Sequence, residues 1–268
     1  MKTIIFCILF LCQVISTFAC TIFSWTEGDR VLAANNEDWS NPKTRVWFYP
    51  AEDGKYGRMF VGFNDFFGQG GMNDQRLFYD WVAGSQTKWK KDKNKQTFDA
   101  PSEVMLERCA TVEEAIEFYT LTNEPGFSYA RIMVADASGA SAIMGYRGGE
   151  FFVDRGKGGF QVFGFGRKQV DEVLQEDIAE ADVVSRASNA LKEAMQRGKY
   201  PTQYSNVCDL TAGVMWIYDF RRSETPFLLS LEEELAKGRH YYDIPELESQ
   251  IGEPLRDIKK PSWWDRLF

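Results

Sequence analysis

The chain has 268 residues and a formal net charge of −8, with 39 acidic against 31 basic side chains. This acidic balance is spread along the sequence and excludes nucleic acid as an expected partner. With a single histidine and no Cys-x-x-Cys or His-Glu-x-x-His spacing, no metal site is expected, and no motif indicates a cofactor.

Residues 1–19 are typical of a signal peptide. Lys2 supplies a positive charge, residues 4–14 are apolar, and Thr17 and Ala19 give the small-residue pattern of a cleavage site. The apolar run is shorter than the ~20 residues that a membrane-spanning helix needs. We therefore expect an exported protein, secreted or periplasmic, without stable membrane insertion after cleavage.

Two other interpretations of this junction stay open. The apolar segment is also compatible with an uncleaved anchor, or with a lipoprotein signal in which Cys20 carries the lipid. In the expected case residues 20–268 form one domain, which is long enough for a single large core.

The mature chain is expected to begin with a β-hairpin. Apolar runs at 20–25 and 31–36 flank the turn-rich segment 26–30, and the second run leads into Asp38. In a simple antiparallel register, Asp38 approaches Cys20.

Further strands and helices alternate along the rest of the chain. Alternating and apolar runs predict strands at 45–49, 59–63, 77–83, 130–135, 140–146, 150–153, 160–165, 204–210 and 214–220. Helical periodicity, with proline at a start or glycine at a stop, predicts helices at 101–109, 112–121, 177–197 and 231–237. The glycine clusters 68–71 and 156–159 lack the context of a phosphate loop and are interpreted as turns.

The cysteines leave one thiol to explain. Cys7 and Cys12 lie in the leader, and Cys109 and Cys208 lie in apolar surroundings typical of buried thiols. Cleavage after Ala19 gives Cys20 a free α-amine. A thiol and an amine with pKa values near ~8.5 and ~8 can act as nucleophile and base at neutral pH. His240 is interpreted as a packed histidine and not as a partner of a cysteine.

The sequence resembles the choloylglycine hydrolase family of linear amide hydrolases, which includes bile salt hydrolases and penicillin V acylases. The resemblance is carried, in order along nearly the whole mature chain, by Cys20-Thr21, Asn35-Asn36-Glu37-Asp38, Gly71-Met72-Asn73-Asp74 and the segment 204–210. It implies an α+β fold, the four-layer αββα sandwich of N-terminal nucleophile hydrolases. It also implies that a non-peptide amide bond of a small acylated substrate is cleaved through an acyl-enzyme on Cys20.

The resemblance also implies roles for individual residues. Asp38 matches the aspartate that holds the amine of the nucleophile, and Arg186 matches an arginine that reaches the site. Asn35 stands where the family has an arginine, and Gly164 stands where it has an oxyanion-binding asparagine. We expect Cys20, Asp38 and Arg186 in catalysis, and Asn35, Asn73 and Gly164 in substrate binding.

These departures leave a second hypothesis open. The family has a further polar side-chain donor at a position that falls near Val82 and Ala83, and neither of these residues has a polar side chain. The chain is therefore either an enzyme that uses backbone donors or a degenerate ligand-binding member. The partner expected in both cases is a small amide, and a homo-oligomer is left open.

Overall fold

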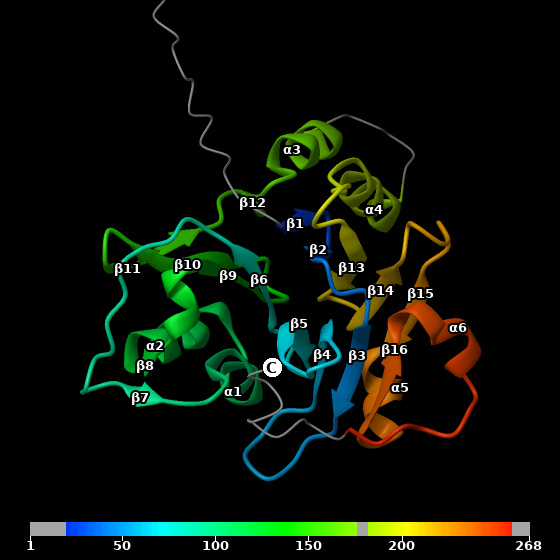
Figure 1. Cartoon of the computed structure of the whole chain (residues 1–268), viewed down its shortest axis with the longest axis horizontal. Coiled ribbons are helices and arrows are strands. Elements are labelled where there is room, and N and C mark those ends of the chain that lie inside the picture. Colours follow the sequence, from blue (N-terminus) through cyan, green and yellow to red (C-terminus); the bar gives the residue numbers. More distant parts are fainter. Residues whose placement is uncertain (1–19, 176–181, 259–268) are drawn as a thin grey trace, which may run out of the picture.

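The computed structural model describes residues 20–175 and 182–258, so the predicted signal peptide lies outside the described residues. Two large antiparallel sheets stack face to face and carry helices on their outer faces (Figure 1). The predicted αββα sandwich is confirmed. None of the helices in the two described ranges is long and apolar enough to cross a membrane.

The first sheet has six strands and contains the predicted N-terminal hairpin. From one edge to the other it consists of β12 (Phe160–Gly164), β1 (Thr21–Glu27), β2 (Arg30–Asp38), β13 (Thr202–Asp209), β14 (Val214–Tyr218) and β15 (Phe227–Ser230). The hairpin therefore lies inside the sheet, with a neighbour on each side.

The second sheet has eight strands. In order they are β11 (Glu150–Arg155), β10 (Ser141–Arg147), β9 (Ala130–Ala135), β6 (Phe78–Ala83), β5 (Gly68–Asn73), β4 (Arg58–Phe63), β3 (Thr44–Tyr49) and β16 (His240–Asp243). A separate parallel pair joins β7 (Gln96–Thr97) to β8 (Thr122–Asn123).

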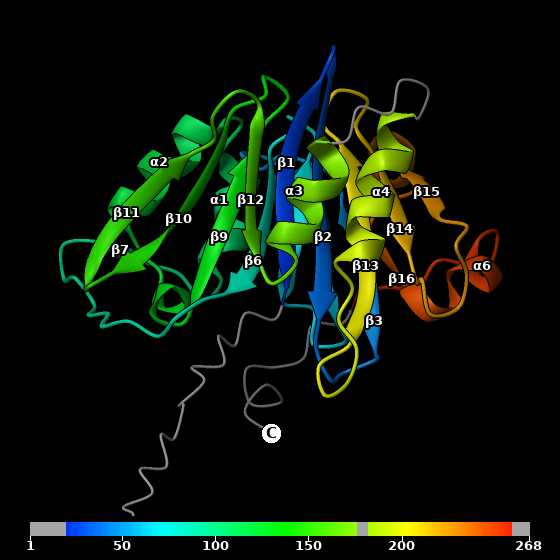
Figure 2. The ribbon, with the colours of Figure 1, turned by 90° about the horizontal axis from the view of Figure 1, so that it is seen from above.

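Helices cover both outer faces. In Figures 1 and 2, α3 (Arg167–Gln175) and α4 (Val183–Glu193) lie on the six-stranded sheet, and α1 (Pro101–Arg108) and α2 (Val112–Leu121) lie on the eight-stranded one. The shorter elements are η1 (Pro125–Ser128), α5 (Leu231–Ala236), η2 (Ile244–Glu246) and α6 (Leu247–Gln250).

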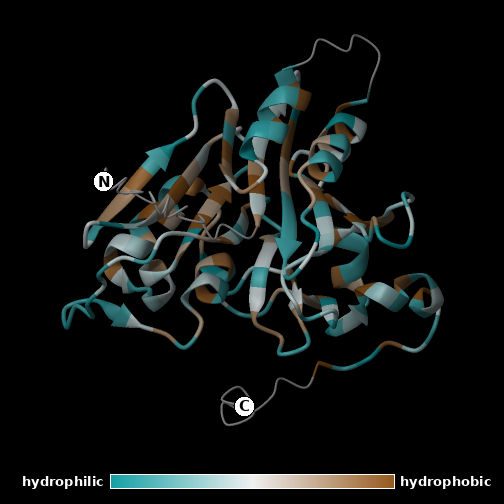
Figure 3. Cartoon of the chain, turned by 45° about the horizontal axis from the view of Figure 1, so that its top comes forward, coloured by the Kyte–Doolittle hydropathy of each residue, from teal (hydrophilic) through white to brown (hydrophobic). Residues whose placement is uncertain are grey.

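The core is divided among the layers. One buried cluster fills the space between the sheets, and two more lie beneath the helices on either side. The central cluster includes Ile22, Met72 and Met133, all fully buried. Figure 3 shows brown, hydrophobic stretches along the strands of these layers. Burial on both faces explains why several strands read as continuous apolar runs and not as alternating ones.

Two sequence predictions need correction. The glycine cluster 68–71, interpreted as a turn, forms most of strand β5, whereas the cluster 156–159 does lie in a turn. The helix predicted at 177–197 is α4, which spans only Val183–Glu193, and residues 176–181 lie outside the described ranges. Its N-cap is Asp182, whose carboxylate accepts a hydrogen bond from the Ser185 amide.

Candidate active site

The β1–β2 hairpin brings Cys20 next to the end of β2. Thr21 pairs with Asn36 and Glu27 with Arg30, which confirms the simple register. Gly28 closes the turn with φ of +61°, a conformation that glycine adopts readily. Cys20, one residue before β1, therefore lies beside Glu37 and Asp38.

The Cys20 thiol is buried among acidic groups. Its Sγ lies 3.7 Å from Glu37 Oε1, and only 6% of the residue is exposed. Burial, followed by the negative charges of Glu37 and Asp38, raises the pKa of the thiol well above its usual value, while a hydrogen bond from the Asp38 amide opposes the shift. Without a positive charge beside it, this thiol stays protonated at neutral pH.

Asp38 is fixed by two donors from the segment around β13. Thr202 Oγ1 donates to Oδ1 at 2.5 Å, and Gln196 Nε2 donates to Oδ2 at 2.7 Å. Burial raises the pKa of Asp38 to about 7, although both hydrogen bonds lower it. The carboxyl group is thus held in one orientation and titrates near neutrality.

Asn35 connects the two sheets. Its Nδ2 donates to Asp80 Oδ1 at 2.7 Å, and both residues are fully buried. Burial and the charge of Glu37 raise the pKa of Asp80 well above its usual value. The amide donor that we expected to contact substrate is therefore committed to a carboxyl group on β6.

Gly164 lies directly against the main chain of Cys20. It pairs with Thr21 and has φ of +111°, and a Cβ built on it would lie 2.1 Å from the Cys20 carbonyl oxygen. The next amide, that of Phe165, donates to the same oxygen at 3.0 Å. The missing side chain thus lets the Cys20 main chain approach β12 closely.

Asn73 is not brought to the site. Its Nδ2 donates to the carbonyl oxygens of Leu106 and Cys109 at 2.9 and 2.7 Å, and its Oδ1 accepts from the amide of Leu77. All three contacts fix the turn after β5 against the end of α1. The Gly-Met-Asn-Asp motif therefore has a structural explanation in this chain.

Arg186 is also placed elsewhere. It lies near the far end of β1, where its guanidinium donates to the Leu174 carbonyl oxygen at 2.9 Å and stands 4.8 Å from the ring centre of Trp25. It also pairs with Glu27 at 3.4 Å. These contacts fix α3 and α4 to β1 and leave Arg186 outside the residues that line the Cys20 cavity.

A cavity of about 660 Å³ opens onto Cys20. Its walls are largely apolar and aromatic, and come from β6, from the loops after β2 and β4, and from η1. They include Trp39, Phe63, Phe67, Trp81, Val82, Ala83, Pro125 and Tyr129. The volume falls within the range of small-molecule sites, and Cys20 lies on the cavity wall.

Three acidic residues that sequence reasoning missed belong to this region. Glu37 and Glu124 line the cavity, and Asp80 lies behind Glu37. Glu37 could have been predicted from the sequence, because side chains alternate along a strand and Glu37 therefore lies on the same face as Asn35. The sequence around Glu124 and Asp80 had no such signal, since only the tertiary fold brings the start of η1 and strand β6 to Cys20.

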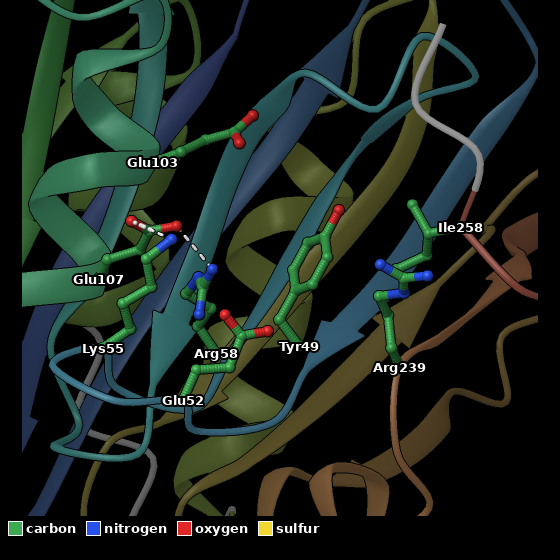
Figure 4. Close-up of a pocket in the computed structure, with 8 residues that line it drawn as sticks. All are labelled: Tyr49, Glu52, Lys55, Arg58, Glu103, Glu107, Arg239 and Ile258. Carbon is green, nitrogen blue, oxygen red and sulfur yellow. Dashed lines mark hydrogen bonds and ion pairs between the residues drawn. The ribbon is translucent and has the colours of Figure 1, made fainter.

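A second cavity, of about 390 Å³, has a different character. Figure 4 shows Lys55 and Arg58 facing Glu107, with which they pair at 3.3 and 2.6 Å. Tyr49 and Arg239 complete part of its wall. Its lining, within the described residues, contains no cysteine, serine, threonine or histidine, so it offers no nucleophile of the kind found at Cys20.

The remaining thiols and the histidine are packed as predicted. Cys109 and Cys208 are free and buried. His240 is fully buried, stacks on Phe48 at 4.7 Å between ring centres and lies 3.0 Å from Glu234. His240 pairs with a carboxylate and not with a cysteine.

Comparisons with solved structures identify the fold. Penicillin V acylase from Agrobacterium tumefaciens aligns over 90% of this chain and 98% of its own, with 15% identity and a TM-score of 0.66. A mutant of conjugated bile acid hydrolase from Clostridium perfringens aligns over 83% and 95%, with 16% identity and a TM-score of 0.66. No family model and no curated protein sequence matches the chain. The chain therefore has the fold of these hydrolases, the N-terminal nucleophile fold that its resemblance to the choloylglycine hydrolase family implied.

Proposed function

We propose that this protein is an exported hydrolase that cleaves a linear amide bond of a small acylated substrate, with Cys20 as an N-terminal nucleophile. One observation carries the proposal. The Cys20 sulfur lies on the wall of a cavity of about 660 Å³, one residue before β1, in a chain with the fold of an acylase and a bile acid hydrolase.

Cleavage after Ala19 would supply the missing base. Burial and the acidic surroundings raise the pKa of the Cys20 thiol, which makes the thiol a poor nucleophile in the uncleaved chain. A free α-amine on the same residue titrates near ~8, and in its protonated form it is a positive charge beside the sulfur. The amine would therefore both accept the thiol proton and stabilise the thiolate.

The reaction would proceed in two balanced steps. The α-amine takes the thiol proton, the sulfur attacks the amide carbonyl carbon, and the carbon–nitrogen bond breaks as the protonated amine passes its proton to the leaving nitrogen. Water then attacks the thioester, which releases the acid and restores the thiol. Glu37, whose Oε1 lies 3.7 Å from Sγ, and Asp38, whose carboxyl is fixed by Thr202, are the carboxyl groups that would hold the amine.

Backbone amides would have to stabilise the oxyanion. Val82 and Ala83 line the cavity and carry no polar side chain, and Gly164 carries none either. Removing one donor from an oxyanion hole costs about 10² to 10³ in rate. We therefore expect turnover slower than that of an enzyme with two side-chain donors.

The test begins with the secreted protein. Its N-terminal sequence should start at Cys20, and a panel of amides and activated esters should add one acyl group to that residue, detected by intact mass. Cys20→Ser and Cys20→Ala should lose amide turnover, whereas Cys109→Ala, which removes another buried thiol, should keep it. Turnover retained in both Cys20 variants would refute the mechanism.

The two other hypotheses give different readouts in the same experiment. A degenerate ligand-binding protein would bind amides without forming the acyl adduct. A lipoprotein would show the mass of a diacylglycerol group on Cys20 and no free α-amine. Either result replaces the proposed activity.

A further inference from the structure

Acidic side chains surround the Cys20 cavity without a cationic side chain to balance them. The carboxyl groups that line it belong to Glu37, Asp38, Asp65, Asp99 and Glu124. Among the described residues that line the cavity, none is a lysine, arginine or histidine. Burial raises the pKa of Glu37 to about 8 and the pKa values of Asp38 and Glu124 to about 7, so the cavity presents its full negative potential to a ligand above neutral pH.

Glu124 is the lining carboxylate farthest in sequence from the nucleophile and is poorly satisfied. It is only 5% exposed, and its Oε1 accepts a hydrogen bond from the Gly126 amide at 2.9 Å. Its Oε2 is buried without a hydrogen-bond partner in the described residues. A buried carboxylate oxygen without a donor is costly, so the Glu124 side chain, which lines the cavity, would be stabilised by turning toward a ligand that brings a donor and a positive charge.

Aromatic rings complete the environment of a cation. A Cβ built on Gly126 would lie 3.0 Å from Glu124 Oε1 and 3.3 Å from the Trp81 ring, so carboxylate and indole flank the same main chain. Trp39 and Tyr129 also line the cavity and are exposed at 48% and 59%. Aromatic faces attract ammonium and guanidinium groups.

The arrangement fits an organic cation better than a metal ion. No three histidine, cysteine, aspartate or glutamate side chains of the described ranges are grouped closely enough to hold a metal. An ammonium group needs only one or two carboxylate oxygens and an aromatic wall, and both are present.

We propose that the substrate of this site is an amide that carries a positive charge, such as an N-acyl derivative of a diamine, and that Glu124 binds its ammonium group. The inference deepens the proposed function and rests on it for the chemistry. Hydrolysis would release the acid and the free diamine, while the apolar walls hold the acyl group.

Three amides of matched length test the charge preference. The phenylacetyl amides of 1,4-diaminobutane, butylamine and 4-aminobutanoate differ at the end of the chain, which is positive, neutral or negative. One charged hydrogen bond contributes about 10- to 100-fold, so kcat/KM should be higher by that factor for the cationic amide than for the neutral one. The anionic amide should be the poorest. Equal values, or a preference for the anion, would overturn the proposal.

A matched pair of variants assigns the preference to Glu124. In Glu124→Gln the ratio of kcat/KM between the cationic and neutral amides should collapse to near one. In Glu113→Gln, which removes the same charge from an exposed side chain of α2, the ratio should be unchanged. A ratio that survives Glu124→Gln, in protein whose melting transition is intact, contradicts the assignment.

Binding to an inactive variant separates this inference from the proposed function. If no amide is turned over and no acyl adduct forms on Cys20, the hydrolase proposal fails. The dissociation constants of the same three amides for Cys20→Ala still measure the charge preference by titration calorimetry. Tighter binding of the cationic amide, by about tenfold or more, supports the inference, and equal constants overturn it.

Discussion

Gly70 and Asp80 form a cross-strand pair in which the glycine makes room for a buried carboxyl group. A Cβ built on Gly70 would lie 2.0 Å from Asp80 Oδ2. Asp80 in turn accepts the hydrogen bond of Asn35, which ties the eight-stranded sheet to the strand that carries Glu37 and Asp38. Gly70 of the eight-stranded sheet thus leaves the space that Asp80 needs to bind Asn35 of the six-stranded sheet.

Gly70→Ala should lower the free energy of unfolding by about 1 to 3 kcal/mol, because the added methyl group displaces the Asp80 carboxyl. Urea unfolding measures the loss. Gly84→Ala is the control, since its Cβ would come no closer than 3.3 Å to the flexible side chain of Arg131. Equal losses in the two variants would show that the space beside Asp80 is not limiting.

Removal of residues 1–19 should activate the Cys20 thiol. We expect a chain that begins at Cys20 to react with iodoacetamide at pH 7.5 at least about tenfold faster than one that retains Ala19, because the new ammonium group lowers the thiol pKa by a unit or more. Peptide mass spectrometry gives both rates, with buried Cys109 as the internal reference. Identical rates would argue against the α-amine as the activating group.

Thr202→Val should shift the acid limb of the pH–rate profile to higher pH. The Thr202 hydroxyl lowers the pKa of Asp38, so its loss raises that pKa above about 7, and the ionised carboxylate is then populated only at higher pH. Thr202→Ser keeps the hydroxyl and should keep the profile. An unchanged profile for the valine variant would remove Asp38 from the rate-determining ionisation.

Glu124→Gln should stabilise the fold at alkaline pH and not at acid pH. Unfolded glutamate ionises near ~4.3, whereas the folded pKa is about 7, so the folded state holds more protons between these values and the free energy of unfolding falls as pH rises. The variant lacks this loss, and its advantage should grow to at most about 4 kcal/mol above pH 7. Urea unfolding at pH 5 and pH 8 measures the difference in free energy of unfolding between the variant and the unmodified protein. The same difference at both pH values contradicts the prediction.

Arg186→Ala should lower the free energy of unfolding clearly and change kcat/KM only slightly. The side chain fixes α3 and α4 to β1 at a distance from Cys20, so we expect a loss of about 1 to 3 kcal/mol in the free energy of unfolding. Effects of such distant sites on each other are small, and kcat/KM should change by less than about threefold. Abolished turnover in a folded variant would restore the role that the resemblance implied.

Local signals in the sequence were enough to predict the hairpin that begins beside Cys20. The turn formers at 26–30 separate two apolar runs, and the register that follows puts Asp38 beside Cys20. The helix α3 was missed although its signal was present, since Val170 and Leu174 are apolar at the i, i+4 spacing of a buried face. Helix and strand signals of this kind depend only on neighbours in the chain.

What could not be predicted depends on partners far apart in sequence. The glycines of β5 look like turn residues until Asp80 is seen to occupy the space beside Gly70. Asn73 and Arg186 match family motifs in sequence, yet both form contacts with helices that no motif specifies. The charge of the cavity is likewise set by loops and by the start of η1, where Glu124 is the N-cap, and these segments meet only after folding.

The seven cross-strand pairs between β1 and β2 hold Cys20 and Asp38 in one hairpin, whereas part of the surrounding cavity wall comes from the other sheet. Cys20 and Asp38 keep their spacing through one short turn, and Trp81 and Val82 belong to β6 of the eight-stranded sheet. A substitution that shifts one sheet relative to the other should therefore change the shape of the cavity and leave the distance between Cys20 and Asp38 unchanged.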